Sequence, residues 1–325
     1  MAHAKKQSVL ITGASGFIGR NLFEALSQRA DLEVYGTYFS RKFSVNPKLL
    51  RVDLRDLDLI PKILQVGFDV VIHAAAATSD AKDQAIPPYF DSTANIVMNM
   101  LLLEEAARNS VKQFIFLSSP AVYFLCLGRP DWESITGQGR IDKKDIGAAL
   151  TKLYTERLCD FYSMRSRTRF SIVRPASIYG PHDRFNLESS RTVGTAITKV
   201  MSAPHGGTIN VDGDGSEEVD LLYVSDLVRF IELLLGKQSS SFEIYSIGSG
   251  SPLSLRALLE KVMVLMQKPL RVEFGALKSA IPSKPVLDSS KAERNFGWTP
   301  QILLDEGLKR TLAWYRENIV QHDLE

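Results

Sequence analysis

The chain has 325 residues, of which 45% are hydrophobic and 23% are charged, and its formal net charge is +2. This composition is typical of a globular protein that is long enough for one large domain and a smaller lobe. No long basic block is present, and no run approaches the roughly 20 apolar residues of a membrane helix, so we expect neither nucleic acid nor a membrane as partner. Because the N-terminus leads into a strand without the apolar core of a signal peptide, we expect a cytoplasmic protein.

Strands and helices alternate through the first half of the chain. The expected strands are β-branched or aromatic, and several are apolar on both faces, as a parallel sheet covered on both sides requires. Between them lie amphipathic helices, the first at 17–30, in which Ile18, Leu22 and Leu26 recur every four residues. This alternation predicts an α/β fold with a doubly wound parallel Rossmann sheet. The expected strands are Ser8–Thr12, Glu33–Tyr38, Leu49–Val52, Val70–His73, Phe114–Leu117 and Phe170–Arg174, and two further helices are expected at Ser92–Asn109 and Lys144–Met164.

The second half of the chain does not continue this alternation of strands and helices. Prolines and glycines between 181 and 215 indicate irregular chain, and two short helices are expected near Leu253–Met266 and Leu304–Asn318. We therefore assign residues 1–178, together with about 222–248, to a dinucleotide-binding Rossmann domain. The segments of about 179–221 and 249–325 are assigned to a smaller, discontinuous C-terminal lobe that binds substrate.

A glycine-rich turn follows the first expected strand. Gly13 allows a tight turn, Gly16 lets the backbone approach a pyrophosphate, and Gly19 lets the helix pack closely on the strand. The free N–H groups at the start of the helix would then face the phosphates. Since the glycines follow a strand and open an amphipathic helix, the pattern predicts a dinucleotide site rather than a coincidence of spacing.

The end of the second expected strand indicates which nicotinamide cofactor binds. An NAD site usually has Asp or Glu there to bind the ribose 2′-hydroxyl, but no acid lies between Gly36 and Lys42. Ser40, Arg41 and Lys42 are able to cradle a 2′-phosphate instead, so NADP(H) is favoured and NAD(H) is the alternative. If NAD(H) binds, Arg41 and Lys42 are only solvated loop charges. Asp53, just after the third strand, is a candidate acceptor for the adenine amino group or a helix N-cap.

Further motifs resemble, in the same order, those of the extended short-chain dehydrogenases/reductases, the group of nucleotide-sugar epimerases, dehydratases and 4-ketoreductases. The resemblance implies a nucleoside-diphosphate sugar as substrate and a homodimer as assembly. The matching segments are TGASGFIG at 12–19, Asp53-Leu54, HAAA at 73–76, Asn95, FLSSPAVY at 116–123, TKLYTE at 151–156, RPASIYGP at 174–181, YVSDL at 223–227, Asp288, Lys291-Ala292, and GWTP at 297–300. The cofactor contacts implied by the glycine turn, the strand ends and the resemblance are Gly13, Ser15, Gly16, Phe17, Ile18, Gly19, Ser40, Arg41, Lys42, Asp53, Leu54, Ala74, Ala75, Lys152, Pro175 and Ile178.

In that family a Ser/Thr–Tyr–Lys group handles the proton while a hydride moves between C4 of a sugar and the nicotinamide. By resemblance, Ser119 bonds the reacting sugar oxygen, and Lys152 holds the cofactor ribose and lowers the pKa of the tyrosine. A phenol whose unperturbed pKa is about 10 needs that lysine on the same helix face, four residues away. The residue four before Lys152 is Ala148, which has no proton to give.

Three explanations of Ala148 are open. A native tyrosine has been replaced by alanine, which the otherwise intact surroundings favour; or the chain is a natural pseudoenzyme that binds without turnover; or another phenol acts instead. Tyr154 is expected to be a packing residue on a different helix face. Tyr123 and Tyr179 are expected in loops above the sheet, from which they could approach a sugar.

Two other departures from the family pattern bear on the reaction. Pro120 and Ala121 stand where the dehydratases carry an Asp-Glu pair, which argues against 4,6-dehydration. The arginine that often precedes the YVSDL segment is absent, so other basic residues, among them Lys199, are expected to bind the diphosphate. The expected substrate contacts are Ser119, Tyr179, Arg184 and Arg191.

The remaining reactive side chains are expected to have no catalytic role. Cys126 and Cys159 are too few for a disulfide framework or a metal site, so we expect both to be buried and no metal to bind. His73, at a strand end, is expected to be a satisfied core histidine. His182 is expected in a loop, with or without contact to substrate.

These observations predict an NADP(H)-dependent 4-ketoreductase of a nucleoside-diphosphate 4-keto sugar, in which Ala148 occupies the position of the proton donor. Such a chain is inactive or severely impaired as it stands. The alternatives are a 4-epimerase that retains NAD and, from another class, a non-catalytic protein that binds a nucleotide sugar or the cofactor.

Overall fold

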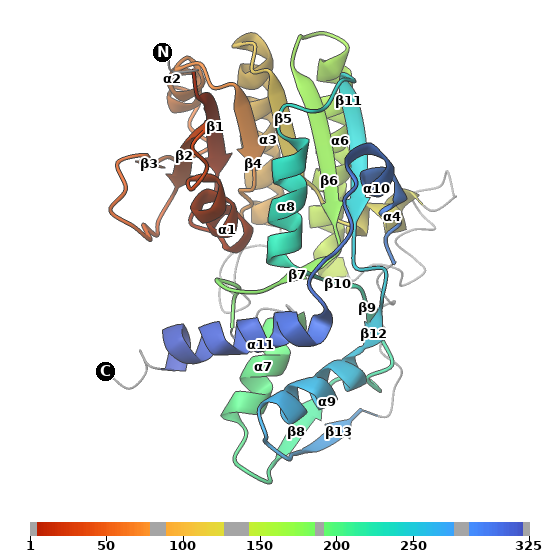
Figure 1. Ribbon diagram of the computed structural model, residues 1–325. Coiled ribbons are helices and arrows are strands. Elements are labelled where there is room, and N and C mark those ends of the chain that lie inside the picture. Colours follow the sequence, from red (N-terminus) through yellow and green to blue (C-terminus); the bar gives the residue numbers. More distant parts are fainter. Residues whose placement is uncertain (1–4, 79–88, 127–142, 186–191, 276–285, 321–325) are drawn as a thin grey trace.

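The computed structural model describes residues 5–78, 89–126, 143–185, 192–275 and 286–320. At its centre lies a seven-stranded sheet in the order β11-β6-β5-β4-β1-β2-β3, in which every neighbouring pair is parallel (Figure 1). The strand order reverses between β1 and β4, the point at which open α/β sheets bind ligands. The strands are β1 (Gln7–Thr12), β2 (Leu32–Tyr38), β3 (Leu49–Arg51), β4 (Val70–His73), β5 (Gln113–Leu117), β6 (Arg169–Pro175) and β11 (Phe242–Ile247).

Helices cover both faces of this sheet. Val9 and Ile11 of β1 enter the core on one face, whereas Leu10 enters the core on the other, because successive side chains of a strand point in opposite directions. Burial on both faces explains why the strands read as nearly continuous apolar runs. The helices of the first face are α1 (Phe17–Leu26) and α8 (Val224–Leu234), and those of the second are α2 (Leu59–Leu64), α3 (Tyr89–Arg108) and α6 (Lys143–Ser163).

A smaller core lies beyond the carboxyl ends of the strands (Figure 1). Three helices, α7 (Thr192–Ser202), α9 (Leu255–Leu265) and α11 (Leu304–Tyr315), bury their apolar faces there. They pack with β8 (Thr208–Val211), which pairs in parallel with β13 (Arg271–Phe274). The remaining elements are short: α4 (Ala121–Cys126), β7 (Ser177–Tyr179), β9 (Glu218–Val219), β10 (Leu221–Tyr223), β12 (Leu253–Ser254), α10 (Ser290–Phe296) and the π-helix η1 (Arg316–Val320).

The predicted α/β Rossmann fold is confirmed, and all six expected strands are present. The irregular chain expected between 181 and 215 is wrong for 192–202, because the apolar spacing of α7 continues across its glycine, and for 208–211, which form β8. Leu287, Ala292 and Trp298 pack into the core beneath α8 rather than into the smaller core, and the Trp298 ring meets Phe230 of α8. Because these residues of the expected C-terminal lobe pack under the sheet domain, the bounds of the two domains stay a prediction.

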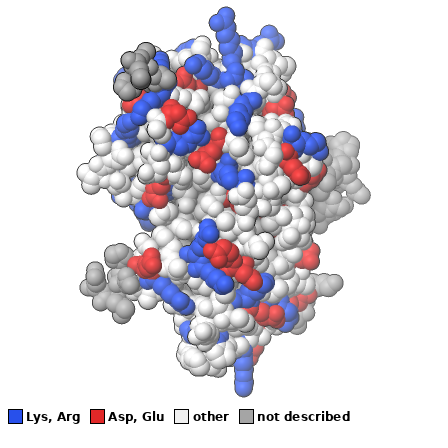
Figure 2. Space-filling view, viewed as in Figure 1, with Lys and Arg blue, Asp and Glu red and all other residues white. Residues whose placement is uncertain are grey.

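Several expectations concern single residues and the surface. Cys159 is buried, as expected, whereas the side chain of Cys126 lies outside the described part of the chain. None of the helices within the described ranges has the length and apolarity to cross a membrane. Within those ranges, no three His, Cys, Asp or Glu side chains gather to hold a metal ion. Figure 2 shows Lys and Arg interspersed with Asp and Glu over the visible face.

Candidate active site

The glycine-rich turn joins β1 to α1 at the carboxyl edge of the sheet. Gly13 has a φ of 72°, and a Cβ there would lie 2.6 Å from the Cα of Ala75, so only glycine fits. A Cβ on Gly19 would lie 2.1 Å from the carbonyl oxygen of Gly13, which explains how closely α1 packs on the turn. No side chain caps α1 at Gly16, which suits a helix N-terminus that binds phosphate. Other expected cofactor contacts reach the same edge of the sheet: Leu54 after β3, Ala74 and Ala75 after β4, Pro175 at the end of β6, and Ile178 in β7.

The carboxyl end of β2 is basic rather than acidic. Ser40, Arg41 and Lys42 follow this strand and are all exposed. Asp53, the candidate for the adenine amino group, forms a two-pronged ion pair with Arg55, with oxygen–nitrogen distances of 2.9 and 2.7 Å. The hydrogen bonds from Arg55 hold the pKa of the Asp53 carboxyl below its usual value. Because α2 begins well after Asp53, the N-cap interpretation of this residue is wrong.

Lys152 extends from α6 toward the carboxyl end of β5. Its Nζ donates to the carbonyl oxygen of Leu117 at 2.7 Å and lies 4.5 Å from the centroid of the Phe116 ring. Burial lowers the pKa of Lys152 to about 8, and the negative charge of Glu156 opposes that shift. The lysine is therefore fixed at the strand end that carries the expected catalytic serine.

Ser119 and Ala148 complete the expected constellation. Ser119 follows Leu117 by two residues, is half-buried, and accepts a hydrogen bond from the N–H of Ala121 at 3.2 Å. Ala148 lies one helical turn before Lys152 on α6, and its side chain is exposed. The position from which a tyrosine would deliver a proton thus carries a methyl group that faces solvent.

Glu156 holds α6 against the sheet. Its side chain is fully buried and accepts a hydrogen bond from Nε of Arg174, on β6, at 2.9 Å. The hydroxyl of Ser118, the residue that follows β5, donates to the same carboxylate at 2.5 Å. Because Glu156 lies one turn after Lys152, these contacts set the rotation of the helix that carries the lysine.

The other candidate phenols are occupied elsewhere. The hydroxyl of Tyr123 is hydrogen-bonded to Oγ of Ser246 on β11. Tyr179 is 1% exposed and its hydroxyl donates to the carbonyl oxygen of Leu304 at 3.4 Å, so the structure places it in a core rather than beside a substrate. Burial raises the pKa of Tyr179, which disfavours its phenolate further. Tyr154 is 47% exposed, so its interpretation as a packing residue is wrong within this chain.

His73 is a satisfied core histidine, as expected. Asn99 donates through Nδ2 to the hydroxyl of Thr155 at 2.9 Å, which leaves its Oδ1 to accept from Nε2 of His73 at 2.8 Å. The Nδ1 atom of His73 then accepts from the Thr12 hydroxyl at 2.7 Å. Burial lowers the pKa of His73 to about 4, so the ring is neutral. This chain of hydrogen bonds joins the residue before the glycine turn to the lysine-bearing helix.

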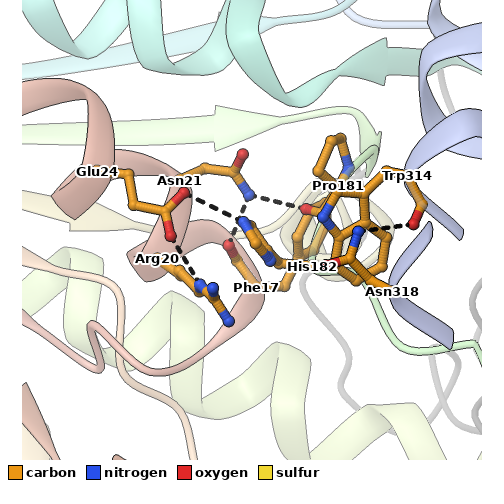
Figure 3. A network of polar contacts seen from close by, with 8 residues as sticks. All are labelled: Phe17, Arg20, Asn21, Glu24, Pro181, His182, Trp314 and Asn318. Atoms are coloured by element: carbon orange, nitrogen blue, oxygen red, sulfur yellow. Dashed lines mark hydrogen bonds and ion pairs between the residues drawn. The ribbon is translucent and has the colours of Figure 1, made fainter. Parts of the chain in front are cut away.

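His182 lies in the turn after β7, as expected, and its ring is held between two helices (Figure 3). Its Nε2 is 3.2 Å from a carboxylate oxygen of Glu24 on α1, and its ring centroid is 5.0 Å from that of Trp314 on α11. Beside it, Asn21 of α1 donates to the carbonyl oxygen of Pro181 at 2.9 Å. The turn after β7 is thus fastened to the helix that begins at the glycine turn.

The basic residues expected to bind the diphosphate do not lie together in the described part of the chain. Arg184 is exposed, and its Nη2 donates to the Thr78 hydroxyl at 3.1 Å. Lys199 donates to the carbonyl oxygen of Asn210 at 3.0 Å, within the smaller lobe. Arg191 lies outside the described residues. Of the two residues that the structure describes, Arg184 is the one that lies near the end of β4.

The sequence profile of the NAD dependent epimerase/dehydratase family matches residues 9–248. The chain belongs to this family. The matched range contains the glycine turn, Ser119 and Lys152, and it confirms the resemblance to extended short-chain dehydrogenases/reductases that modify nucleotide sugars.

Relatives of this epimerase/dehydratase family member include both reductases and epimerases. The dTDP-4-dehydro-6-deoxy-D-allose reductase of a Streptomyces species is 27% identical over 95% of this chain and 96% of its own. A putative UDP-glucose 4-epimerase of Methanocaldococcus jannaschii is 26% identical over 95% of this chain and 99% of its own. The crystal structure of the UDP-glucose 4-epimerase of Thermus thermophilus in complex with NAD matches with a TM-score of 0.77 and 25% identity, over 96% of this chain and all of that one.

Three residues around the site of this family member are not singled out by its sequence. Arg51 of β3 lies beside Tyr38 at the end of β2 because the two strands pair in parallel, and the sequence does not reveal that register. Asn99 occupies one position of a long helix, and Ser246 lies on the unexpected strand β11. A polar residue at a buried helix position is the one signal that could have found Asn99, because a buried amide needs partners.

Proposed function

We propose that this chain has the site of an NADP(H)-dependent 4-ketoreductase of a nucleoside-diphosphate sugar, from which Ala148 removes the proton donor. The observation that carries the proposal is the exposed methyl group of Ala148 one turn before Lys152, whose ammonium group is held on Leu117. Ser119 follows Leu117 by two residues. A site that had lost its function through drift would have no reason to keep the lysine hydrogen-bonded at this strand end.

Each part of the proposed site has a separate task. When bound, NADPH supplies the hydride to C4 of the keto sugar. The uncapped N-terminus of α1 and the glycine turn bind the pyrophosphate, and the basic end of β2 favours the additional phosphate of NADP(H). Lys152, whose Nζ donates to the carbonyl oxygen of Leu117 in the free chain, would hold the cofactor ribose, and Ser119 would donate to the sugar carbonyl oxygen. A positioned proton donor typically contributes 10²–10⁴-fold to the rate, and residue 148 contributes none.

The test is to compare the chain with Ala148→Tyr and, as a matched control, Ala148→Phe, which adds the ring without the hydroxyl. The probes are the 4-keto-6-deoxyhexoses of thymidine, uridine, guanosine and cytidine diphosphate. Stoichiometric oxidation of NADPH by Ala148→Tyr, and by neither of the other two forms, supports the proposal. If Ala148→Tyr turns over no sugar of the panel although it binds NADPH, the proposed reductase is wrong.

A 4-epimerase that retains NAD is the second candidate. The UDP-glucose 4-epimerase of Thermus thermophilus, which was solved with NAD, is the relative that favours it. An epimerase returns the hydride to the sugar, so it consumes no cofactor. In the same assays, interconversion of UDP-glucose and UDP-galactose by Ala148→Tyr without net oxidation of NADPH would favour this candidate over the reductase.

We further propose that the chain forms a homodimer through the outer surfaces of α3 and α6. Val97 and Met100 on α3 and Leu150, Tyr154 and Phe161 on α6 are all between 36% and 50% exposed. These two helices pack side by side on one face of the sheet, so the five side chains offer one apolar surface. A second copy of that surface would cover it in a four-helix arrangement. A cytoplasmic location stays a prediction.

A further inference from the structure

The edge strand β3 places an arginine beside the end of β2. Arg51, the last residue of β3, stands in register with Tyr38, the last residue of β2. Leu49 packs into the core under α1, and Arg51 lies two residues further along the strand, so its side chain leaves the sheet on the α1 face. The pyrophosphate-binding turn begins that helix. Arg51 is thus on the side of the sheet where the adenosine half of a dinucleotide lies.

Two of the basic residues around this strand end are neutralised by ion pairs. Lys48 forms an ion pair with Glu33 at 3.1 Å, and Arg55 forms one with Asp53 at 2.7 Å. Such pairs leave little charge for a ligand, because a new anion would have to compete with a carboxylate that is already in contact.

Three cations at the same strand end have no such carboxylate. Within the described ranges, Arg41, Lys42 and Arg51 form no ion pair. Arg41 and Lys42 belong to the loop after β2, whereas Arg51 belongs to a strand that is hydrogen-bonded to β2. The Nε atom of Arg51 donates to the carbonyl oxygen of Phe39 at 3.4 Å, which directs its guanidinium over the start of that loop. Arg51 is therefore the most rigidly held of the free charges.

The geometry points to Arg51 as a specificity-determining residue that binds the 2′-phosphate of NADP(H). A guanidinium presents paired N–H groups that match a phosphate, and a strand holds it in place better than a loop does. Arg41 and Lys42 add loop charges around the same phosphate. The inference rests on the proposed use of NADP(H) and names the residue that selects it.

The test measures binding and needs no turnover. The dissociation constants of NADPH and NADH are determined by nicotinamide fluorescence on the full chain and on Arg51→Ala, Arg51→Lys and Lys62→Ala. Lys62, an exposed residue of α2 that forms no ion pair in the described part of the chain, controls for the loss of one positive charge. Since a charge-assisted contact is lost, Arg51→Ala is expected to bind NADPH about 10–100-fold more weakly and NADH within about twofold of the unchanged chain. Arg51→Lys is expected to recover part of the loss, and Lys62→Ala to bind both cofactors as the unchanged chain does.

The outcomes separate this inference from the proposed function. Unchanged NADH binding by Arg51→Ala shows that the variant is folded. If the unchanged chain prefers NADPH but Arg51→Ala keeps that preference, the assignment of Arg51 is wrong while the proposed cofactor stands. If the unchanged chain itself binds NADH as tightly as NADPH, the proposed cofactor is wrong, and the assignment of Arg51 is overturned with it.

Discussion

At the scale of single residues, the hydrogen bonds of His73 determine the protonation state of its ring. His73 contacts Thr12 on one side and Asn99 on the other, at 2.7 and 2.8 Å, and it is 1% exposed. A neutral ring satisfies both neighbours, since one nitrogen accepts and the other donates. The unfolded chain imposes no such restriction, so the protonation of His73 is coupled to folding.

This coupling predicts a pH dependence of stability. The pKa of His73 is lowered from 6.5 in the unfolded chain to about 4 in the folded chain, so the unfolded state binds the proton more tightly. Stability from this group is complete above pH 6.5 and is lost as the pH falls toward 4, by about 3 kcal/mol over the whole window. Urea unfolding at several pH values, compared between the chain and His73→Gln, measures it. The chain is expected to lose more stability than the variant between pH 6.5 and 4; parallel curves would contradict the assignment.

At the scale of elements, the position of α6 on the sheet determines where Lys152 lies. The buried contact of Glu156 with Arg174 and Ser118 joins the helix to β5 and β6. The pair is hidden from solvent, with Arg174 6% exposed, so neither partner can turn to water if the other is removed.

Glu156→Gln is therefore expected to lower the free energy of unfolding by about 3 kcal/mol, the amount typical of breaking a buried ion pair. The matched control is Glu306→Gln on α11, whose ion pair with Arg310 at 2.7 Å is half exposed on both sides and should cost less than about 1 kcal/mol. Denaturant unfolding of both variants gives the comparison. Equal losses would show that the buried pair does not hold α6.

A comparison of the elements with the sequence shows which parts of the fold and of the site were predictable. The buried parallel strands were predictable because each is a compact apolar run, whereas β11 is an edge strand with partly exposed residues such as Glu243, and it was missed. The spacing of Ala148 and Lys152 on one helix was predictable in the same way, since it needs only helical geometry. The place of Arg51 beside Tyr38 was not, because strand register depends on contacts between segments far apart in the chain.

At the scale of the whole molecule, the lobe beyond the sheet is tied to the cofactor domain at several points. His182 and Asn21 fasten the turn after β7 to α1, and Trp314 of α11 closes over the same histidine (Figure 3). On the far side of the sheet, α3 and α6 keep apolar side chains exposed, as Tyr154 illustrates. The proposed homodimer would cover this second, apolar surface and leave the lobe beyond the sheet free.

The proposed homodimer predicts that a charge on this surface separates the protomers. Tyr154→Glu places a carboxylate in the centre of the apolar surface, and its burial without a partner is unfavourable. Sedimentation velocity at micromolar concentration is expected to show a dimer for the chain and a monomer for Tyr154→Glu. Val264→Glu, which changes an exposed apolar residue of α9 in the other lobe, is expected to stay dimeric. A monomeric parent chain, or a dimeric Tyr154→Glu, would contradict the arrangement.

The most direct measurement on this molecule is the steady-state rate of NADPH oxidation by Ala148→Tyr, with saturating thymidine-diphosphate 4-keto-6-deoxyglucose. The parent chain and Ala148→Phe serve as references, and all three forms are first shown to bind NADPH. If only a proton donor is missing from the site, kcat is expected to rise by at least about 10²-fold in Ala148→Tyr and to stay at the parent value in Ala148→Phe. If tyrosine and phenylalanine at position 148 give the same rate with every sugar of the panel, the hydroxyl is not what the site lacks, and the proposed reductase is wrong.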